Sequence, residues 1–106
     1  MTPRRGDVYW ITFPAPVGRR PALVVQNDVG NRSSPSTIVA ILSTAPRHDY
    51  PFLVSLAADE LGTPAWVHCE SLDTVLISRL EEKLGTLSLQ TMSAVDEALK
   101  VSLGLR

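Results

Sequence analysis

Hydrophobic and polar positions follow two different periods along the chain. Between residues 8 and 77, short runs rich in valine, isoleucine and aromatic side chains alternate with stretches of asparagine, aspartate, glycine, serine and proline. Runs of this kind are typical of β-strands, and the residues between them favour turns. The predicted strands are residues 8–13, 22–26, 37–43, 52–56, a segment that begins at Trp66 and includes Val67 and His68, and residues 73–77.

The last segment has the period of a helix. Its apolar residues recur at three- and four-residue steps, so that they share one face. They are Leu89, Met92, Val95, Leu99 and Leu103. Ser88 is a suitable N-cap and Gly104 can end the helix. Many short strands followed by one helix, without a repeat or a linker, predict a single mainly β domain over residues 1–106, built as a barrel or a sandwich.

Composition excludes several classes of protein. Apolar residues make up 44% of the chain and charged residues 20%, which is ordinary for a globular domain and unlike a disordered chain. Cys69 is the only cysteine and the N-terminus lacks the features of a signal peptide, so a reducing cytoplasm is expected. The longest apolar runs are strand-sized, far short of the roughly 20 residues that span a bilayer, and predict no membrane segment.

Charge is distributed unevenly between the two halves. Residues 1–50 carry six arginines against three aspartates, a net charge of +3, whereas residues 51–106 carry four basic and eight acidic groups, a net charge of −4. Every basic residue of the first half is an arginine, whose planar fork binds phosphate in two places. This bias suits a phosphate-binding face, although ordinary ion pairing explains it equally well.

Three blocks of sequence carry a family resemblance. They are RGDVYWITF, GRRPALVVQND and GNRSSPSTIVAILST, and together they cover most of the first 44 residues. The chain resembles the MazF/PemK/Kid family of toxin endoribonucleases in these letters and, less closely, in the pattern of the remaining residues. An Arg-Pro pair that opens a valine-rich strand ending in Gln-Asn-Asp is more specific than a lone glycine motif.

The resemblance implies a fold, an activity and partners. It implies an SH3-like β-barrel with a C-terminal α-helix, assembled as a homodimer. The implied enzyme is a sequence-specific endoribonuclease that cleaves single-stranded RNA, including mRNA, without a metal or other cofactor. The implied inhibitor is a cognate MazE-like antitoxin, whose acidic, disordered segment covers the arginine-rich face.

The resemblance also assigns catalytic residues. Arg20, immediately before Pro21, matches the family's catalytic arginine, and Pro21 restrains Arg20 to extended geometry. The catalytic threonine of the family falls at Ser43 or Thr44, of which Ser43 is the aligned residue, and either hydroxyl can serve. In such a reaction the substrate's own 2′-hydroxyl attacks the adjacent phosphorus, and positive charge stabilises the phosphorane.

Further residues are predicted to contact RNA. These are Arg4, Arg5, Arg19, Arg32, Arg47, His48, Gln26 and Asn27. Arg19 is a second cation beside Arg20, and His48 follows the Ser43–Thr44 strand end and can titrate near neutral pH. Gln26 and Asn27 either orient the site or build the following turn. Tyr9 and Trp10 alternate in the first strand, so one is expected in the core and the other can face outward as a stacking platform, with core packing the favoured role for both.

Neither histidine predicts a metal site. His48 and His68 are far apart in sequence, and Cys69 neighbours only one of them. No pair has the short spacing of a zinc site, so no metal is expected.

One departure from the family supports a rival prediction. Typical members have a longer first loop with a Gly-Ser-Glu segment, whereas this chain runs FPAPVGRRP and lacks that glutamate, a proposed acid/base group. The rival is therefore a non-catalytic RNA- or protein-binding barrel that has lost cleavage with its shortened loop. Action on a gyrase-like target is a third alternative, which the arginine and hydroxyl pair makes less favoured.

Overall fold

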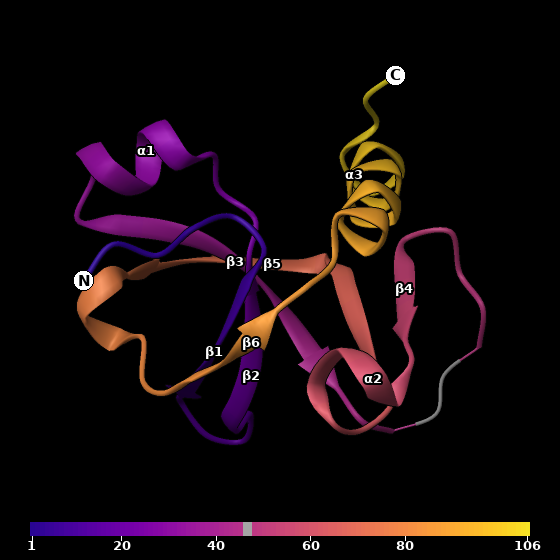
Figure 1. Cartoon of the computed structure of the whole chain (residues 1–106), viewed down its shortest axis with the longest axis horizontal. Helices are drawn as coiled ribbons and strands as arrows, with labels where there is room; N and C mark the ends of the chain where they lie inside the picture. The colour runs from indigo at the N-terminus through magenta and orange to yellow at the C-terminus, as the bar shows by residue number, and fades with distance from the viewer. Residues whose placement is uncertain (46–47) are drawn as a thin grey trace.

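The computed structural model describes residues 1–45 and 48–106. Its elements are β1 (Asp7–Phe13), β2 (Gly18–Val24), α1 (Asp28–Ser33), β3 (Ser36–Ser43), β4 (Leu53–Leu56), α2 (Ala58–Leu61), β5 (Ala65–Leu76), the 3-10 turn η1 (Ile77–Arg79), β6 (Lys83–Thr86) and α3 (Leu89–Leu103). The strands form one antiparallel sheet in the order β4-β5-β3-β2-β1-β6 (Figure 1). This architecture confirms the predicted mainly β class with a C-terminal helix.

Two apolar clusters cover the sheet. The larger one lies beneath α3 and contains Val8, Leu23, Ala40, Leu42, Val67, Met92 and Val95. The second contains Tyr9, Ile11, Phe13, Val24, Val39 and Val75. Both clusters draw on alternating positions of β1, β2 and β3, because successive side chains of a strand point to opposite faces. The central strands are therefore buried on both sides, as their continuous valine and isoleucine runs indicate.

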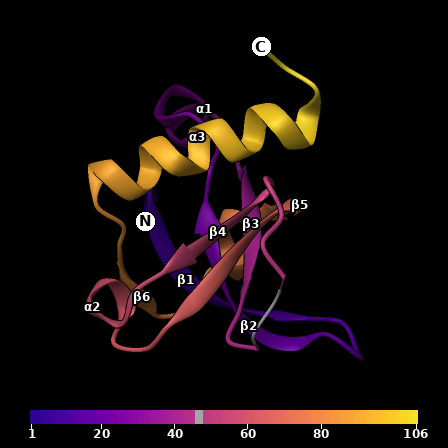
Figure 2. The same cartoon turned by 90° about the vertical axis from the view of Figure 1, so that its right-hand side faces the viewer.

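Helix α3 packs across β4 and β5 through its middle turns (Figure 2). The hydroxyl of Ser88 accepts a hydrogen bond from the Thr91 amide, and Gly104 ends the helix at a φ of +70°, which confirms both predicted caps. Leu89 and Leu103 at the two ends of the predicted stripe are 90% and 55% exposed, so the buried part of the stripe is shorter than the sequence pattern. In the described part of the chain, no helix has the length and apolar character needed to cross a bilayer.

The curled sheet is closed by a short helix between its edges. Helix α2 contacts both β4 and β6, the two edge strands. A Cβ atom added to Gly85 of β6 would lie 3.0 Å from a methyl group of Leu61 of α2, so the absence of a side chain at Gly85 permits this close approach. The result is a half-barrel whose open edge α2 covers.

Three predictions about individual elements are wrong. The segment from Trp66 and residues 73–77 were predicted as separate strands, but β5 runs continuously from Ala65 to Leu76 because both parts pair with β3. The polar stretch before β3 contains helix α1, which Asn27 caps through a hydrogen bond to the Gly30 amide. The stretch after β4 contains helix α2, which ends at Gly62. These short helices satisfy their own backbone groups within segments whose composition favours turns.

Candidate active site

The ends of β2 and β3 meet at a groove of about 500 Å³. These strands pair in antiparallel fashion with Ala22 opposite Ile41. Arg20, two residues before Ala22, and Ser43, two residues after Ile41, therefore lie at the same end of the strand pair. The groove is lined by Trp10, Val17, Arg19, Arg20, Pro21, Leu42, Ser43, Thr44, Leu61, Thr63, Ala65 and Leu84. Strand pairing thus brings together the three residues predicted to be catalytic.

Arg20 is an exposed side chain held by its own hairpin. Its Nε donates a hydrogen bond of 3.2 Å to the carbonyl oxygen of Val17. The connection between β1 and β2 is a tight turn in which the Val17 amide donates to the Pro14 carbonyl, and Gly18 follows at a φ of +71°. The turn contains no carboxylate, and because the bond to Val17 uses Nε, both terminal nitrogens of Arg20 remain available to a ligand within the described part of the chain.

Arg19 and Trp10 form one wall of the groove. The guanidinium carbon of Arg19 lies 4.4 Å from the centre of the Trp10 ring, and its Nε donates to Glu81 at 3.0 Å. The hydroxyl of Thr12 also donates to Glu81, at 2.7 Å. These bonds, first that of Thr12 and then that of Arg19, lower the pKa of Glu81. Glu81 therefore stays ionised and holds Arg19 over the indole.

The two aromatic residues of β1 have the alternation expected of them. Tyr9 is buried, 5% exposed, and its hydroxyl donates to the Asp7 carboxylate at 3.4 Å. Burial, together with the charge of Asp7, raises the pKa of Tyr9. Trp10 instead lines the groove and is half-buried. Only Trp10 of this pair presents a ring surface at the site.

A smaller hollow of about 210 Å³ adjoins the groove and shares Arg20 and Ser43 with it. Here the hydroxyl of Ser43 lies 2.8 Å from Nε2 of His68, and Nδ1 of His68 lies 3.1 Å from a carboxylate oxygen of Glu70. Ser43 is only 6% exposed. From the sequence, His68 was considered only as a metal ligand, and Glu70 was not among the predicted site residues.

These two residues lie at an irregularity in β5. Between the pairs Ala40–Leu72 and Leu42–Val67, β3 advances two residues and β5 advances five. The extra residues of β5 form a bulge, a feature that commonly re-aims side chains beside active sites. His68 and Glu70 are two residues apart on the same face of a strand, and this His-x-Glu spacing is the signal that was available in the sequence.

The remaining predicted RNA contacts are not gathered at the groove. Arg4 and Arg32 line a separate hollow beside α1 with Asp28. Arg5 binds the Asp96 carboxylate at 2.7 Å and the Val25 carbonyl at 2.8 Å, which ties the N-terminal segment to α3 and to the residue that follows β2.

Gln26 and Asn27 serve the turn that follows β2. The side-chain amide of Gln26 donates to Asn31 and to the Ser36 carbonyl, both at 3.0 Å. Asn27 caps α1, as described above. Of the two roles that the sequence left open for these residues, their contacts are those of turn formation.

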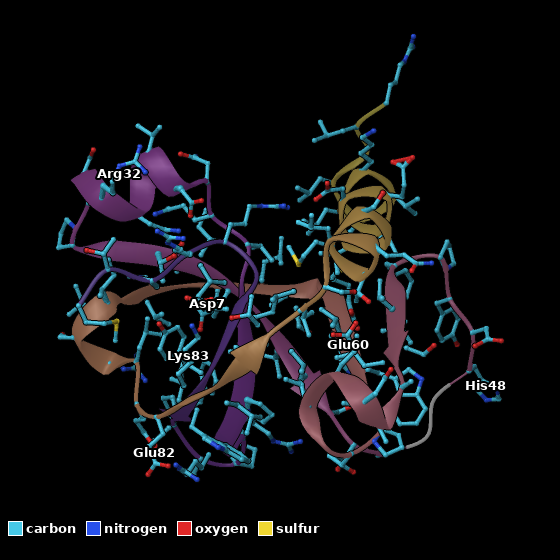
Figure 3. The ribbon with its side chains drawn as sticks, in the orientation of Figure 1. Asp7, Arg32, His48, Glu60, Glu82 and Lys83 are labelled. Atoms are coloured by element: carbon cyan, nitrogen blue, oxygen red, sulfur yellow. The ribbon has the colours of Figure 1, made fainter. Side chains whose placement is uncertain are left out.

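His48 and Arg32 lie on opposite sides of the molecule (Figure 3). The His48 ring stands edge-on to the Tyr50 ring, with their centres 6.4 Å apart, in the exposed loop before β4. Arg47 lies outside the described residues.

Cys69 is fully buried beneath the site, at 0% exposed. Burial, followed by the charge of Glu70, raises the pKa of this thiol to about 11. Because the thiolate is the reactive form, Cys69 is a core residue at neutral pH and not a nucleophile.

Comparison with known proteins adds independent information. Residues 4–103 match the profile of the PemK-like, MazF-like toxins of type II toxin-antitoxin systems. Over 113 residues, the chain is 38% identical to the endoribonuclease EndoA of Bacillus subtilis (strain 168), covering 99% of this chain and 97% of that protein.

Solved structures agree with this match. An endoribonuclease from a mycobacterial species, in complex with its cognate antitoxin, is similar with a TM-score of 0.88 and 29% identity over 98% of this chain and 97% of that chain. A MazE-MazF crystal structure from Deinococcus radiodurans gives a TM-score of 0.84 and 28% identity over 100% of both chains. These similarities extend over the β-sheet and α3 alike.

Proposed function

The chain belongs to the PemK-like, MazF-like family of type II toxins, and from this membership we propose that the groove between β2 and β3 is where it cuts single-stranded RNA. The protein is the toxin endoribonuclease of a toxin-antitoxin system, and a cognate antitoxin is its partner. The observation that carries the location is the convergence of Arg20, Ser43 and Thr44, from two strands, on one groove.

The chemistry follows from these side chains. The 2′-hydroxyl of one nucleotide attacks the adjacent phosphorus and displaces the 5′-oxygen of the next. Arg20 supplies a forked cation for the phosphorane oxygens. The hydroxyls of Ser43 and Thr44 lie at the end of β3, beside Arg20, where they can bond the scissile group. The products are a 2′,3′-cyclic phosphate and a 5′-hydroxyl, and no metal takes part.

Arg19 and Trp10 bind the RNA beside the scissile phosphate. An indole face stacks on any base, and the second cation neutralises a neighbouring phosphate. In this proposal the outer RNA contacts, used by longer strands that extend past the groove, are Arg4, Arg5, Arg32 and His48. The antitoxin binds across the same arginines through an acidic, disordered segment, and so competes with RNA. The active form is a cytoplasmic homodimer.

The test is cleavage of a mixed-sequence single-stranded RNA in EDTA, followed by mapping of the ends. The wild type is expected to leave discrete cuts at one short motif at substoichiometric concentration. Arg20→Ala should be slower by about a hundredfold or more, because a preorganised charge is lost. Arg106→Ala, which removes an arginine at the far C-terminus, is the matched control. Wild-type protein that only protects RNA at stoichiometric concentration would establish the non-catalytic barrel instead.

A further inference from the structure

The geometry points to His68 as the general base of RNA cleavage, with Glu70 as the residue that positions its ring. This inference rests on the proposed function, and it adds two residues from β5 to a site otherwise built by β2 and β3. Its basis is a chain of two hydrogen bonds. One joins the Ser43 hydroxyl to Nε2 of His68 at 2.8 Å, and the other joins Nδ1 of His68 to the Glu70 carboxylate at 3.1 Å.

The hydrogen bonds determine which ring nitrogen carries the proton. An ionised carboxylate only accepts hydrogen bonds, so Nδ1 of His68 must be the donor to Glu70. In the neutral ring, Nε2 is then an acceptor, and the hydroxyl of Ser43 donates to it. This leaves the lone pairs of the Ser43 oxygen directed away from His68, free to accept a hydrogen bond from a substrate hydroxyl.

His68 is placed where a base is needed. Its side chain is 12% exposed and lines the small hollow together with Arg20 and Ser43. A scissile phosphate held by Arg20 would therefore lie beside the Ser43–His68 pair. The charged groups facing His68 in the described residues are Glu70 from β5 and Arg20 from β2. The other described residues that line the hollow, Val17, Ile41 and Ser71, are uncharged.

The 2′-hydroxyl gives its proton to Ser43 as Ser43 gives its own to Nε2 of His68, and the bond between O2′ and phosphorus forms. The bond between phosphorus and O5′ breaks, and O5′ takes a proton from water. The hydroxide left by that water is neutralised by the proton that His68 releases to solvent. The enzyme ends in its starting state.

This arrangement separates the roles of the two hydroxyls. Ser43 is 6% exposed and committed to His68, so it relays the proton. Thr44 is exposed at the rim of the groove, so its hydroxyl can donate to a phosphate oxygen. The sequence alone left open which of the two hydroxyls serves in catalysis.

The first test replaces the base by a side chain of similar reach. His68→Gln can still bond Ser43 but cannot accept a proton near neutral pH. We expect kcat to fall on the order of 10²- to 10⁴-fold, the usual contribution of a general base, with KM little changed. Glu70→Gln should give a smaller loss of kcat, which Glu70→Asp partly restores. Asp73→Asn, at another exposed acidic position of β5, is the matched control for Glu70→Gln and should keep wild-type activity.

Two readouts separate catalysis from a structural role. The wild-type rate should fall towards acidic pH over the range in which histidines become protonated, because a protonated ring cannot act as a base. The residual activity of His68→Gln should lack this acidic limb. Free imidazole should restore cleavage by His68→Ala, since it supplies the missing base to the vacated hollow. A substrate with a 2′-deoxy sugar at the cut position should bind and stay intact.

The possible outcomes distinguish the two claims. A wild-type protein that does not cleave RNA contradicts the proposed function itself. Wild-type cleavage that depends on Arg20, together with an unchanged rate in His68→Gln, overturns the role of His68 alone. If the variants fail to fold, as judged by thermal unfolding, the wild-type pH profile decides: an acidic limb supports the base, and a flat profile through that range overturns it.

Discussion

The guanidinium of Arg19 lies 4.4 Å above the Trp10 ring and is held there by Glu81, which also accepts a hydrogen bond from Thr12. A cation over an indole face is attracted to the electron-rich ring. The Arg19 side chain therefore covers one face of the Trp10 ring. An RNA base can displace this side chain or add to the stack. Arg19 and Trp10 act as one unit at the wall of the groove, although the sequence alone offered them as separate candidates.

Replacing Trp10 is expected to weaken RNA binding more than it changes the chemical step. Trp10→Ala should lower the affinity for a 2′-deoxy substrate analogue by about 1–3 kcal/mol, the contribution of one stacked base. Trp10→Phe should retain most of the affinity, because it keeps an aromatic face. The measurement is a binding titration, and equal affinities for all three proteins would show that the indole is only part of the wall.

Arg20 should not tolerate lysine. Lysine keeps the positive charge but not the planar fork that contacts two phosphate oxygens, so Arg20→Lys is expected to recover only part of the roughly hundredfold loss caused by Arg20→Ala. Single-turnover rates with saturating enzyme measure this directly. A lysine variant with the full wild-type rate would mean that only the charge at this position matters.

Salt dependence should distinguish groove arginines from outer ones. Each phosphate contact on a single strand contributes about 0.7 to the slope of log affinity against log salt. Arg19→Ala should reduce that slope by about this amount even for a short RNA that spans only the groove. Arg32→Ala, beside α1, should leave the short RNA unaffected and reduce the slope only for longer strands. If Arg32→Ala also reduced the slope measured with the short RNA, Arg32 would lie at the groove in solution.

Glu60 makes the stability of the C-terminal helix depend on pH. It accepts hydrogen bonds from the hydroxyls of Thr91 and Ser88 and from the Ser88 amide. These bonds, that of Thr91 foremost, lower the pKa of Glu60 from its ordinary value of 4.5. Because the folded state prefers the ionised form, the stabilisation is complete above pH 4.5 and is lost as the pH falls through the folded-state pKa.

Glu60→Gln is accordingly expected to reduce the free energy of unfolding at neutral pH, by about 1 kcal/mol for a partly exposed charged hydrogen-bond acceptor. The difference from wild type should shrink at acidic pH. Urea unfolding at several pH values measures this, and Glu97→Gln on the exposed side of α3 is the control. A constant difference at every pH would show that the lost bonds do not depend on the carboxylate charge.

The sequence predicted the elements whose pattern is local. The apolar and aromatic run of β1, the valine-rich β3 and the caps of α3 are all readable from neighbouring residues, because side-chain period and turn chemistry act over a few positions. Helices α1 and α2 were missed because each is shorter than two helical turns, too short to show a period, and lies in a segment rich in turn residues. The continuity of β5 was missed because its bulge interrupts the pattern of one strand.

By itself, the amino-acid sequence determined the mainly β class and the C-terminal helix, and it predicted Arg20 and the hydroxyls at the end of β3 as the central site residues. Only the tertiary structure decided what surrounds them. His68 meets Ser43 across 25 residues of chain, and Arg19 meets Glu81 across 62. A periodic pattern shows on which face of a helix or strand a side chain lies. The register of strand pairing and the position of a bulge depend on packing of the whole sheet, and these decide which distant side chains meet.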